Sequence, residues 1–279
     1  MQEEIVVKAP TTEALTPAQI TQKAEDLGVT KTEMSFGRSF ALSIMAGAFI
    51  AMGAMFFSLV VGDPALPFAI QRVLGGFLFC LGLILVVVAG AELFTGNTMI
   101  VMTAASKRIK WSAVWKNWIV VFFGNFLGAL VIVGLVFLSD MSAMNGGQAG
   151  ETMVSVAAGK MHADWLVLFA KGIMCNFLVC LGVWMAYASK TVADKILAVV
   201  FPITTFVACG FEHCVANMFF LPMGALLASC GIAPAGIDPA SVNMLGALYN
   251  WSATVPGNIV GGALMVGMMY WFIYRKKKN

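Results

Sequence analysis

The chain has 279 residues, of which 60% are hydrophobic and only 11% are charged, and its formal net charge is +3. This composition is far from that of soluble globular proteins and excludes an ordinary soluble domain. In so apolar a chain, a small positive excess indicates membrane topology rather than nucleic-acid binding. We therefore expect an integral membrane protein that contacts lipid and has no nucleic-acid partner.

Six apolar segments follow one another, and each is long enough to cross the hydrocarbon core of a bilayer. They cover residues 39–61, 73–106, 118–138, 164–188, 196–229 and 252–274. If the N-terminus is cytoplasmic, every lysine and arginine lies on the cytoplasmic side except Arg72, Lys160 and Lys171. This bias follows the positive-inside rule, so the sequence predicts a multi-pass protein of the inner (plasma) membrane with both termini in the cytoplasm.

The charge pattern divides the chain into three parts. A cytoplasmic tail (1–35) precedes a transmembrane transport domain (36–274), and a basic cytoplasmic C-terminus (275–279) follows it. The tail is polar and does not resemble a cleavable signal sequence.

One short helix is expected within the tail. Thr16 is a suitable N-cap, Pro17 suits the first helical position, and Gln19 completes a capping-box pattern. Gly28 is expected to end this helix. We expect the helix to lie on the cytoplasmic face of the membrane domain; a gating role is the alternative.

The second and fifth apolar segments are longer than the roughly 20 residues that a span requires, and polar residues interrupt both. The interruptions fall at residues 91–97 and 209–217. Each contains an acid and, five residues later, an asparagine: Glu92 with Asn97, and Glu212 with Asn217. Because lipid cannot satisfy the backbone groups that a break leaves unpaired, we expect these four residues to brace the breaks. The carboxylates are expected to bind N–H groups at half-helix N-termini.

The third and sixth segments also resemble each other, at residues 124–130 and 257–264. The chain therefore reads as two related halves of three spans, and because three is odd, the second half must be inverted in the membrane. The predicted fold class is an all-α membrane protein of six transmembrane helices in two inverted three-helix repeats, with the second and fifth helices broken. Asn125, Asn176 and Asn258, which lie beside small residues, are expected to bond to the broken backbone from neighbouring helices.

Three ionisable residues lie deep in the segments: Glu92, Glu212 and His213. Ionisable residues at membrane depth are costly and usually face a bundle interior or a pathway. We expect His213 to donate a hydrogen bond to a small anion or to exchange a proton with it. These residues are too few for a metal centre, and the six cysteines form no C-x-x-C or His/Cys cluster, so no metal, cofactor or disulfide framework is expected.

These motifs resemble the formate/nitrite transporter family along nearly the whole chain, and within it the bacterial formate channels most. The residues that carry the resemblance are Gly75-Gly76, 79–85, Leu93-Phe94-Thr95, Asn117-Trp118, Gly124-Asn125, 206–217 and 257–262. The resemblance implies an aquaporin-like fold and a homopentamer with one pore in each protomer.

The resemblance also implies which residues line the narrow parts of the pore. By matching position, Phe79, Leu83 and Phe206 would form its apolar constrictions. Leu93 and Thr95 would lie on the loop that breaks the second helix.

Other roles follow from the same resemblance. His213 would be the central pore residue, Lys160 would attract anions to the outer vestibule, and Asn176 and Asn258 would line or stabilise the pore. The chain departs from the formate channels at Gly96-Asn97, where they continue with Ser-Thr.

Apolar rings around one histidine suit a solute that crosses in neutral form. An isolated carboxylate costs tens of kcal/mol to bury at low dielectric. Protonating a small acid with a pKa near that of an aspartate side chain costs only about 4 kcal/mol at pH 7. We therefore expect a channel or proton-linked transporter of small monovalent weak-acid anions, formate first, with nitrite or hydrosulfide as the alternative.

Two other classes compete with this interpretation. A water or glycerol pore is expected to carry paired Asn-Pro-Ala motifs, and this chain has only Val215-Ala216-Asn217 at the corresponding place. A membrane-embedded enzyme needs a nucleophile, metal ligands or a cofactor motif, which the sequence does not show. The sequence does not choose between passive flow and proton symport.

Overall fold

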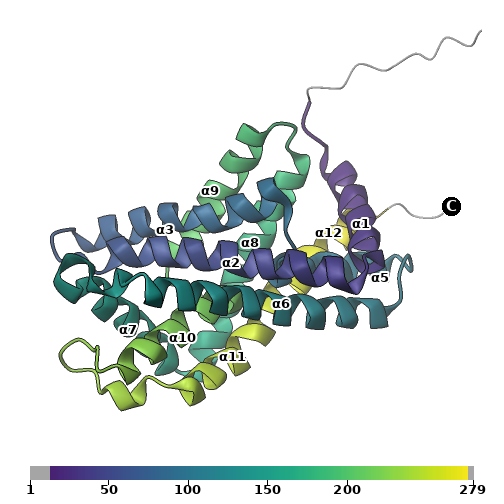
Figure 1. Cartoon of the computed structure of the whole chain (residues 1–279). Coiled ribbons are helices and arrows are strands. Elements are labelled where there is room, and N and C mark those ends of the chain that lie inside the picture. Colours follow the sequence, from purple (N-terminus) through teal and green to yellow (C-terminus); the bar gives the residue numbers. More distant parts are fainter. Residues whose placement is uncertain (1–12, 276–279) are drawn as a thin grey trace, which may run out of the picture.

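A computed structural model of the chain describes residues 13–275, and all regular secondary structure in this part is helical (Figure 1). Residues 1–12 and 276–279 lie outside the described residues. The basic residues Lys8, Lys276, Lys277 and Lys278, which contribute to the topology prediction, are therefore not described, nor is most of the predicted C-terminal segment.

Long apolar helices form the body of the molecule. Within the described residues, five continuous helical segments are long and apolar enough to cross a membrane: Phe36–Val61 (α2), Phe68–Gly90, Trp111–Leu138 (α6), Trp165–Ala188 (α8) and Met244–Tyr274. The second comprises α3 (Phe68–Leu85) and a π-helical turn, η1 (Val86–Gly90), and the last comprises α11 (Met244–Ile259), η5 (Val260–Met268) and α12 (Met269–Tyr274). The fifth apolar segment, which the sequence predicts to be broken, forms two shorter helices, α9 (Val192–Ala208) and α10 (Cys214–Ser229).

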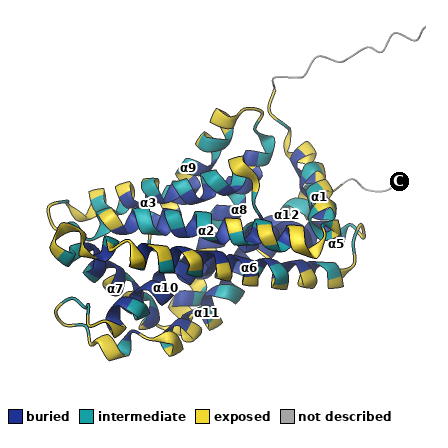
Figure 2. Cartoon of the chain, viewed as in Figure 1, coloured by how far each residue is buried: buried dark blue, intermediate teal, exposed yellow. Residues whose placement is uncertain are grey.

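Both the surface and the packing suit a bilayer. Exposed positions occur along the helices of the molecule (Figure 2). Many of the exposed residues are large and apolar, including Phe123 on α6 and Phe201 on α9. Helix α2 packs against α3 and α6, and α8 packs against α9 and α11. Glycines permit the close approaches: a Cβ at Gly128 would collide with the backbone of α2, and one at Gly261 with the backbone of α8. Small residues at helix contacts are typical of membrane proteins.

The first break is short and extended. Gly90, the last residue of η1, adopts a φ of +85°, and Ala91 is extended. Helical structure resumes in α4 (Phe94–Asn97) and continues through η2 (Thr98–Ile100) and α5 (Val101–Ala105).

The second break has the same form. Helix α9 ends at Ala208, Gly210 adopts a φ of +71°, and α10 begins at Cys214. Both breaks are shorter than the sequence predicts, because Asn97 and Asn217 already lie in the resumed helices.

The helix expected in the tail is present as α1 (Pro17–Glu33), and the predicted capping box of Thr16 and Gln19 is formed. The prediction that Gly28 ends it is wrong. At Gly28 the helix passes so close to α5 that an added Cβ would collide with Thr103. Gly28 is therefore a contact residue rather than a stop.

Shorter helices complete the chain between α6 and α11. They are η3 (Met141–Gly147), α7 (Gln148–Met161) and η4 (Pro239–Ser241). Helix α7 packs against α10, beside the second break.

Candidate functional site

A polar network surrounds the buried carboxylate of the first break. Glu92 Oε1 lies 2.7 Å from Lys31 Nζ, and Glu92 Oε2 accepts a hydrogen bond of 2.7 Å from the Asn97 amide. The same amide donates to Asn117 Oδ1 on α6 at 2.9 Å. Lys31 also donates to Asn97 Oδ1 at 2.8 Å, so the network ties α1 to the break.

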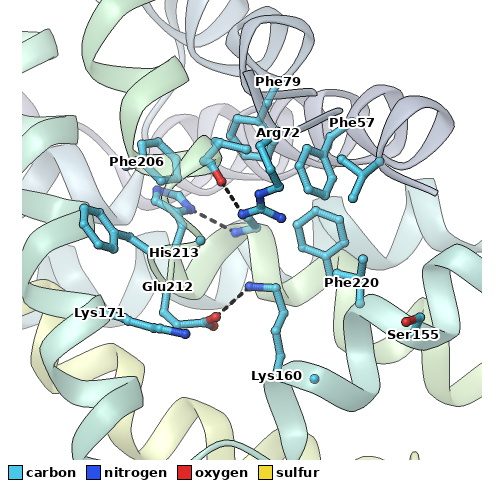
Figure 3. Close-up of a pocket in the computed structure, with 17 residues that line it drawn as sticks. Phe57, Arg72, Phe79, Ser155, Lys160, Lys171, Phe206, Glu212, His213 and Phe220 are labelled. Carbon is cyan, nitrogen blue, oxygen red and sulfur yellow. Dashed lines mark hydrogen bonds and ion pairs between the residues drawn. The ribbon is translucent and has the colours of Figure 1, made fainter. Parts of the chain in front are cut away.

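The second break repeats this network. Glu212 Oε1 lies 2.9 Å from Lys160 Nζ on α7 (Figure 3), and Glu212 Oε2 accepts a hydrogen bond of 2.7 Å from the Asn217 amide. That amide also donates to Asn250 Oδ1 on α11 at 2.8 Å. Each buried carboxylate is thus paired with a lysine and an asparagine, which offsets the cost of burying its charge.

Two asparagines from neighbouring helices bind the broken backbone. Asn125 Oδ1 accepts from the first N–H of α4 at 2.9 Å, and its amide donates to the Glu92 carbonyl at 2.9 Å. Asn258 makes the same pair of bonds to the first N–H of α10 and to the Glu212 carbonyl, both at 2.8 Å. The prediction that the carboxylates bind these N–H groups is therefore wrong. An asparagine amide both donates and accepts, so it can bridge the two ends of a break, whereas a carboxylate only accepts.

The two breaks meet at one hydrogen bond. Thr95 Oγ1, at the start of the first resumed helix, lies 3.0 Å from His213 Nε2, at the end of the second break. His213 is also the N-cap of α10, because its Nδ1 accepts from the Ala216 N–H at 3.0 Å. A ring nitrogen that accepts carries no proton, which assigns the proton to Nε2 and makes His213 the donor to Thr95.

Asn176 on α8 holds this junction in place. Its side chain is fully buried and donates to the Thr95 carbonyl, to the Thr98 hydroxyl and to the Asn258 carbonyl, at 3.2, 3.1 and 2.6 Å. Asn176 and Asn258 line neither of the cavities described below. Of the two roles that the resemblance implied for them, these contacts support stabilisation.

A cavity of about 380 Å³ opens on one side of the junction; we refer to it as the Lys160 cavity. Phe79, Phe206 and His213 line its inner end (Figure 3). The Phe79 and Phe206 rings pack edge to face with centroids 5.7 Å apart, and Phe206 stacks on the His213 ring at 5.8 Å.

A second cavity, of about 580 Å³, lies on the other side; we refer to it as the Lys31 cavity. Leu83 and Leu93 line it together with Glu92 and residues of α1. No residue lines both cavities, and Thr95 lines neither. The apolar residues predicted from the resemblance therefore fall into two groups, with the Thr95–His213 hydrogen bond between them.

The cations of the Lys160 cavity differ in their partners. Lys160 is paired with Glu212, whereas Arg72 donates to the last carbonyls of α9, those of Val207 and Ala208, at 2.8 and 2.9 Å. Lys171 lines the cavity, and its side chain makes no ion pair or hydrogen bond with any described residue. Arg72 and Lys171 therefore add two further cations to the cavity, and neither has a carboxylate partner among the described residues.

Sequence reasoning missed Arg72, Lys171, Lys31, Asn117 and Asn250 as site residues. Arg72 and Lys171 carried a signal, because they are exceptions to the positive-inside pattern, as Lys160 is. In the sequence, Lys31 contributes only to the topology pattern. Asn117 lies in a motif that carries the family resemblance but predicts no role for this residue, and no local pattern marks Asn250.

Comparisons with known proteins identify the family of the chain. The family profile described as "Formate/nitrite transporter" matches residues 18–272. The chain belongs to the formate/nitrite transporter family. Its members are transporters, so the interpretation as a membrane-embedded enzyme no longer applies.

Curated members of this family match over nearly their whole length. The formate channel FocA of Escherichia coli K12 is 39% identical over 275 residues, which cover 95% of this chain and 96% of that protein. FocA of Haemophilus influenzae is 39% identical over 264 residues, which cover 91% of this chain and 93% of that protein.

Solved structures of the family have the same fold. The structure described as a pentameric formate channel with formate bound superposes with a TM-score of 0.77 at 37% identity, covering 86% of this chain and 98% of that one. A channel described as an FNT (formate/nitrite transporter) family ion channel superposes with a TM-score of 0.80 at 27% identity. The superposition covers 91% of this chain and 98% of that one.

Proposed function

We propose that this protein moves formate across the membrane through the path that joins the Lys160 cavity, the Thr95–His213 junction and the Lys31 cavity. The observation that supports this most directly is the junction itself, which offers one N–H donor between two apolar constrictions. The relatives named as formate channels support the choice of formate.

The energetics favour passage in the neutral form. The constriction residues Phe79, Leu83, Leu93 and Phe206 are at most 3% exposed, so a bare anion would lose its hydration there. Stripping a carboxylate of water costs far more than the roughly 4 kcal/mol needed to protonate a weak acid of this strength at pH 7. Formate therefore crosses as formic acid, and the cations of the cavities concentrate the anion at each mouth.

His213 acts in this proposal as a hydrogen-bond donor to the passing solute. Its Nε2 already carries a proton, and its Nδ1 is held by the Ala216 N–H at 3.0 Å. If His213 relayed a proton, its ring would take one of two forms. Protonation of Nδ1 would break the hydrogen bond that caps α10, and donation of the Nε2 proton without protonation of Nδ1 would leave an imidazolate. We therefore propose that the proton comes from water in the cavity and that His213 orients the acid.

We also propose the finer architecture. The chain forms six spans in two inverted halves, assembles as a homopentamer with one pathway in each protomer, and lies in the inner membrane with both termini cytoplasmic. The matching networks support the inverted halves, because equivalent residues occur in the same order in each: Lys31, Glu92, Asn97, Asn117 and Asn125, then Lys160, Glu212, Asn217, Asn250 and Asn258. The Gly96-Asn97 departure fits this arrangement, since Asn97 takes the place that Asn217 takes in the other half.

The function is tested by flux into liposomes that contain the purified protein. Formate, nitrite, hydrosulfide and chloride are compared at several external pH values. The expected result is formate uptake that rises as the external pH falls, with little chloride flux. Chloride is the anion of a strong acid, so it is not protonated to a neutral form at these pH values. Uptake of nitrite or hydrosulfide well above that of formate would reassign the substrate, and uptake no faster than in empty liposomes would contradict a transport function.

A further inference from the structure

The Lys31 cavity is lined by more positive charge than its own carboxylate balances. Lys23 and Lys31 come from α1, Arg38 from α2 and Lys195 from α9, while Glu92 is the only acid among the lining residues. Glu92 is paired with Lys31. Three lining cations therefore have no carboxylate partner among the described residues.

The environment of Lys23 shows that this charge is concentrated. Its ammonium donates to the Tyr187 carbonyl at 2.7 Å, which holds α1 against the end of α8. Burial, and then the charges of Lys195 and Lys190, lower the pKa of Lys23. A ligand with several negative charges at this mouth would relieve the repulsion between these cations.

The volume and the lining residues of the cavity indicate which class of ligand it fits. At about 580 Å³ it is much larger than one formate needs, and its inner end is apolar, formed by Leu83, Val86 and Leu93. A monovalent anion would neutralise one cation at a time, whereas one polycarboxylate could reach cations on α1, α2 and α9 together.

We propose that the Lys31 cavity is a binding site for small organic polycarboxylates, which plug the pathway from the α1 side. Lys23, Arg38 and Lys195 supply the charge that recognises them. A polycarboxylate cannot follow formate from the cavity into the apolar constriction, because each of its carboxylates would first have to be protonated. The free-energy cost of protonation rises with every carboxylate. The plugging step rests on the proposed formate function, but the binding step does not.

Binding is tested first, with citrate as the probe. Calorimetric titration and thermal unfolding of the purified protein compare the parent chain with an Arg38→Ala/Lys195→Ala variant. Neither side chain makes a hydrogen bond or ion pair with a described residue, so this variant is expected to fold. Lys23 is left in place because it anchors α1. The matched control is Lys110→Ala/Lys116→Ala, which removes the same net charge from two exposed lysines outside the cavity.

The expected result is that citrate binds the parent and the control and raises their unfolding temperature, whereas its affinity for the cavity variant falls about fivefold to tenfold. Formate at the same ionic strength should raise the unfolding temperature much less. Equal loss of affinity in both double variants would overturn the site, because it would show a general charge effect. Absence of citrate binding to the parent would overturn it as well.

Plugging is tested by formate flux in everted and right-side-out membrane vesicles from cells that produce the protein. With citrate outside, flux should fall in everted vesicles, which expose the proposed cytoplasmic face, and the Arg38→Ala/Lys195→Ala variant should resist this block. Block from the opposite face, or equal block of parent and variant, would contradict plugging at this cavity. Citrate binding that depends on these two residues, in a protein that shows no formate flux, would leave the site standing and remove the proposed function.

Discussion

Thr95 Oγ1 and His213 Nε2 lie 3.0 Å apart, and this single hydrogen bond joins the two places where the apolar segments are broken. Both side chains are almost fully buried, and each comes from the start of a resumed helix. In the pathway that we propose, the donor to a passing acid is therefore held by two half-helices at once. A change at either residue should alter the pathway without a change in the outer surface.

Replacing Thr95 by valine removes the acceptor of His213 Nε2 and keeps the side-chain shape. We expect the buried N–H left without a partner to lower stability by about 1–3 kcal/mol and to change formate flux. Thr95→Ser, which keeps the hydroxyl, should retain the stability and the formate flux of the parent. Thermal unfolding and liposome flux check this, and a valine variant indistinguishable from the parent in both would show that the hydrogen bond has no role.

Replacing Glu212 by glutamine leaves the half-buried ammonium of Lys160 without its carboxylate. Breaking one side of a buried ion pair typically costs about 3–5 kcal/mol, so this variant should assemble poorly. Glu212→Gln/Lys160→Met should recover part of the loss, because it removes both charges. Size-exclusion profiles and unfolding temperatures are the readouts. Normal assembly of Glu212→Gln with a changed anion preference would show that Glu212 selects the solute rather than bracing the break.

Replacing Lys171 by alanine removes an unpaired cation from the Lys160 cavity. Formate uptake should fall severalfold at low ionic strength and approach that of the parent at high salt, where the Debye length is about 3 Å at 1 M. Lys171→Arg, which keeps the charge, serves as the control. A loss that is equal at every salt concentration would instead indicate direct contact between Lys171 and the solute.

The docking of α1 should depend weakly on pH through Asp26. A hydrogen bond from the Arg108 guanidinium, 2.7 Å away on the connection after α5, lowers the pKa of Asp26. A carboxyl whose folded pKa is lowered stabilises the fold above its ordinary pKa of 3.8, and this contribution is lost as the pH falls through the lowered value. The protection factors of the α1 amides, which compare observed with intrinsic exchange rates, should therefore fall at strongly acidic pH, and should fall less in Asp26→Asn. The same acid response in both proteins would remove Asp26 from this account.

Much of the architecture could be predicted from local patterns. Apolar length locates the spans, and the spacing of Glu92 to Asn97 and of Glu212 to Asn217 identifies both breaks. The Thr16 capping box is equally local and is formed as predicted. Such features depend on residues close together in the sequence, so hydropathy and helix-capping chemistry suffice to find them.

The site's partners depend on contacts between distant residues. Lys31 pairs with Glu92 across 61 positions and Lys160 with Glu212 across 52, and no local rule predicts either pair. The same limit explains Gly28, where local propensity favours a helix end but close packing on α5 keeps the helix going. It also explains why asparagines from α6 and α11, rather than the nearby carboxylates, bind the broken backbone.

The most direct test of the central claim is the pH dependence of formate uptake through His213→Asn in liposomes. Asparagine is a good N-cap and can donate one hydrogen bond, but it cannot carry a proton at these pH values. If the acid takes its proton from water and His213 only orients it, the variant should assemble and its uptake should rise as the external pH falls, as steeply as in the parent. An assembled variant whose uptake no longer responds to pH would contradict this account and show that His213 delivers the proton.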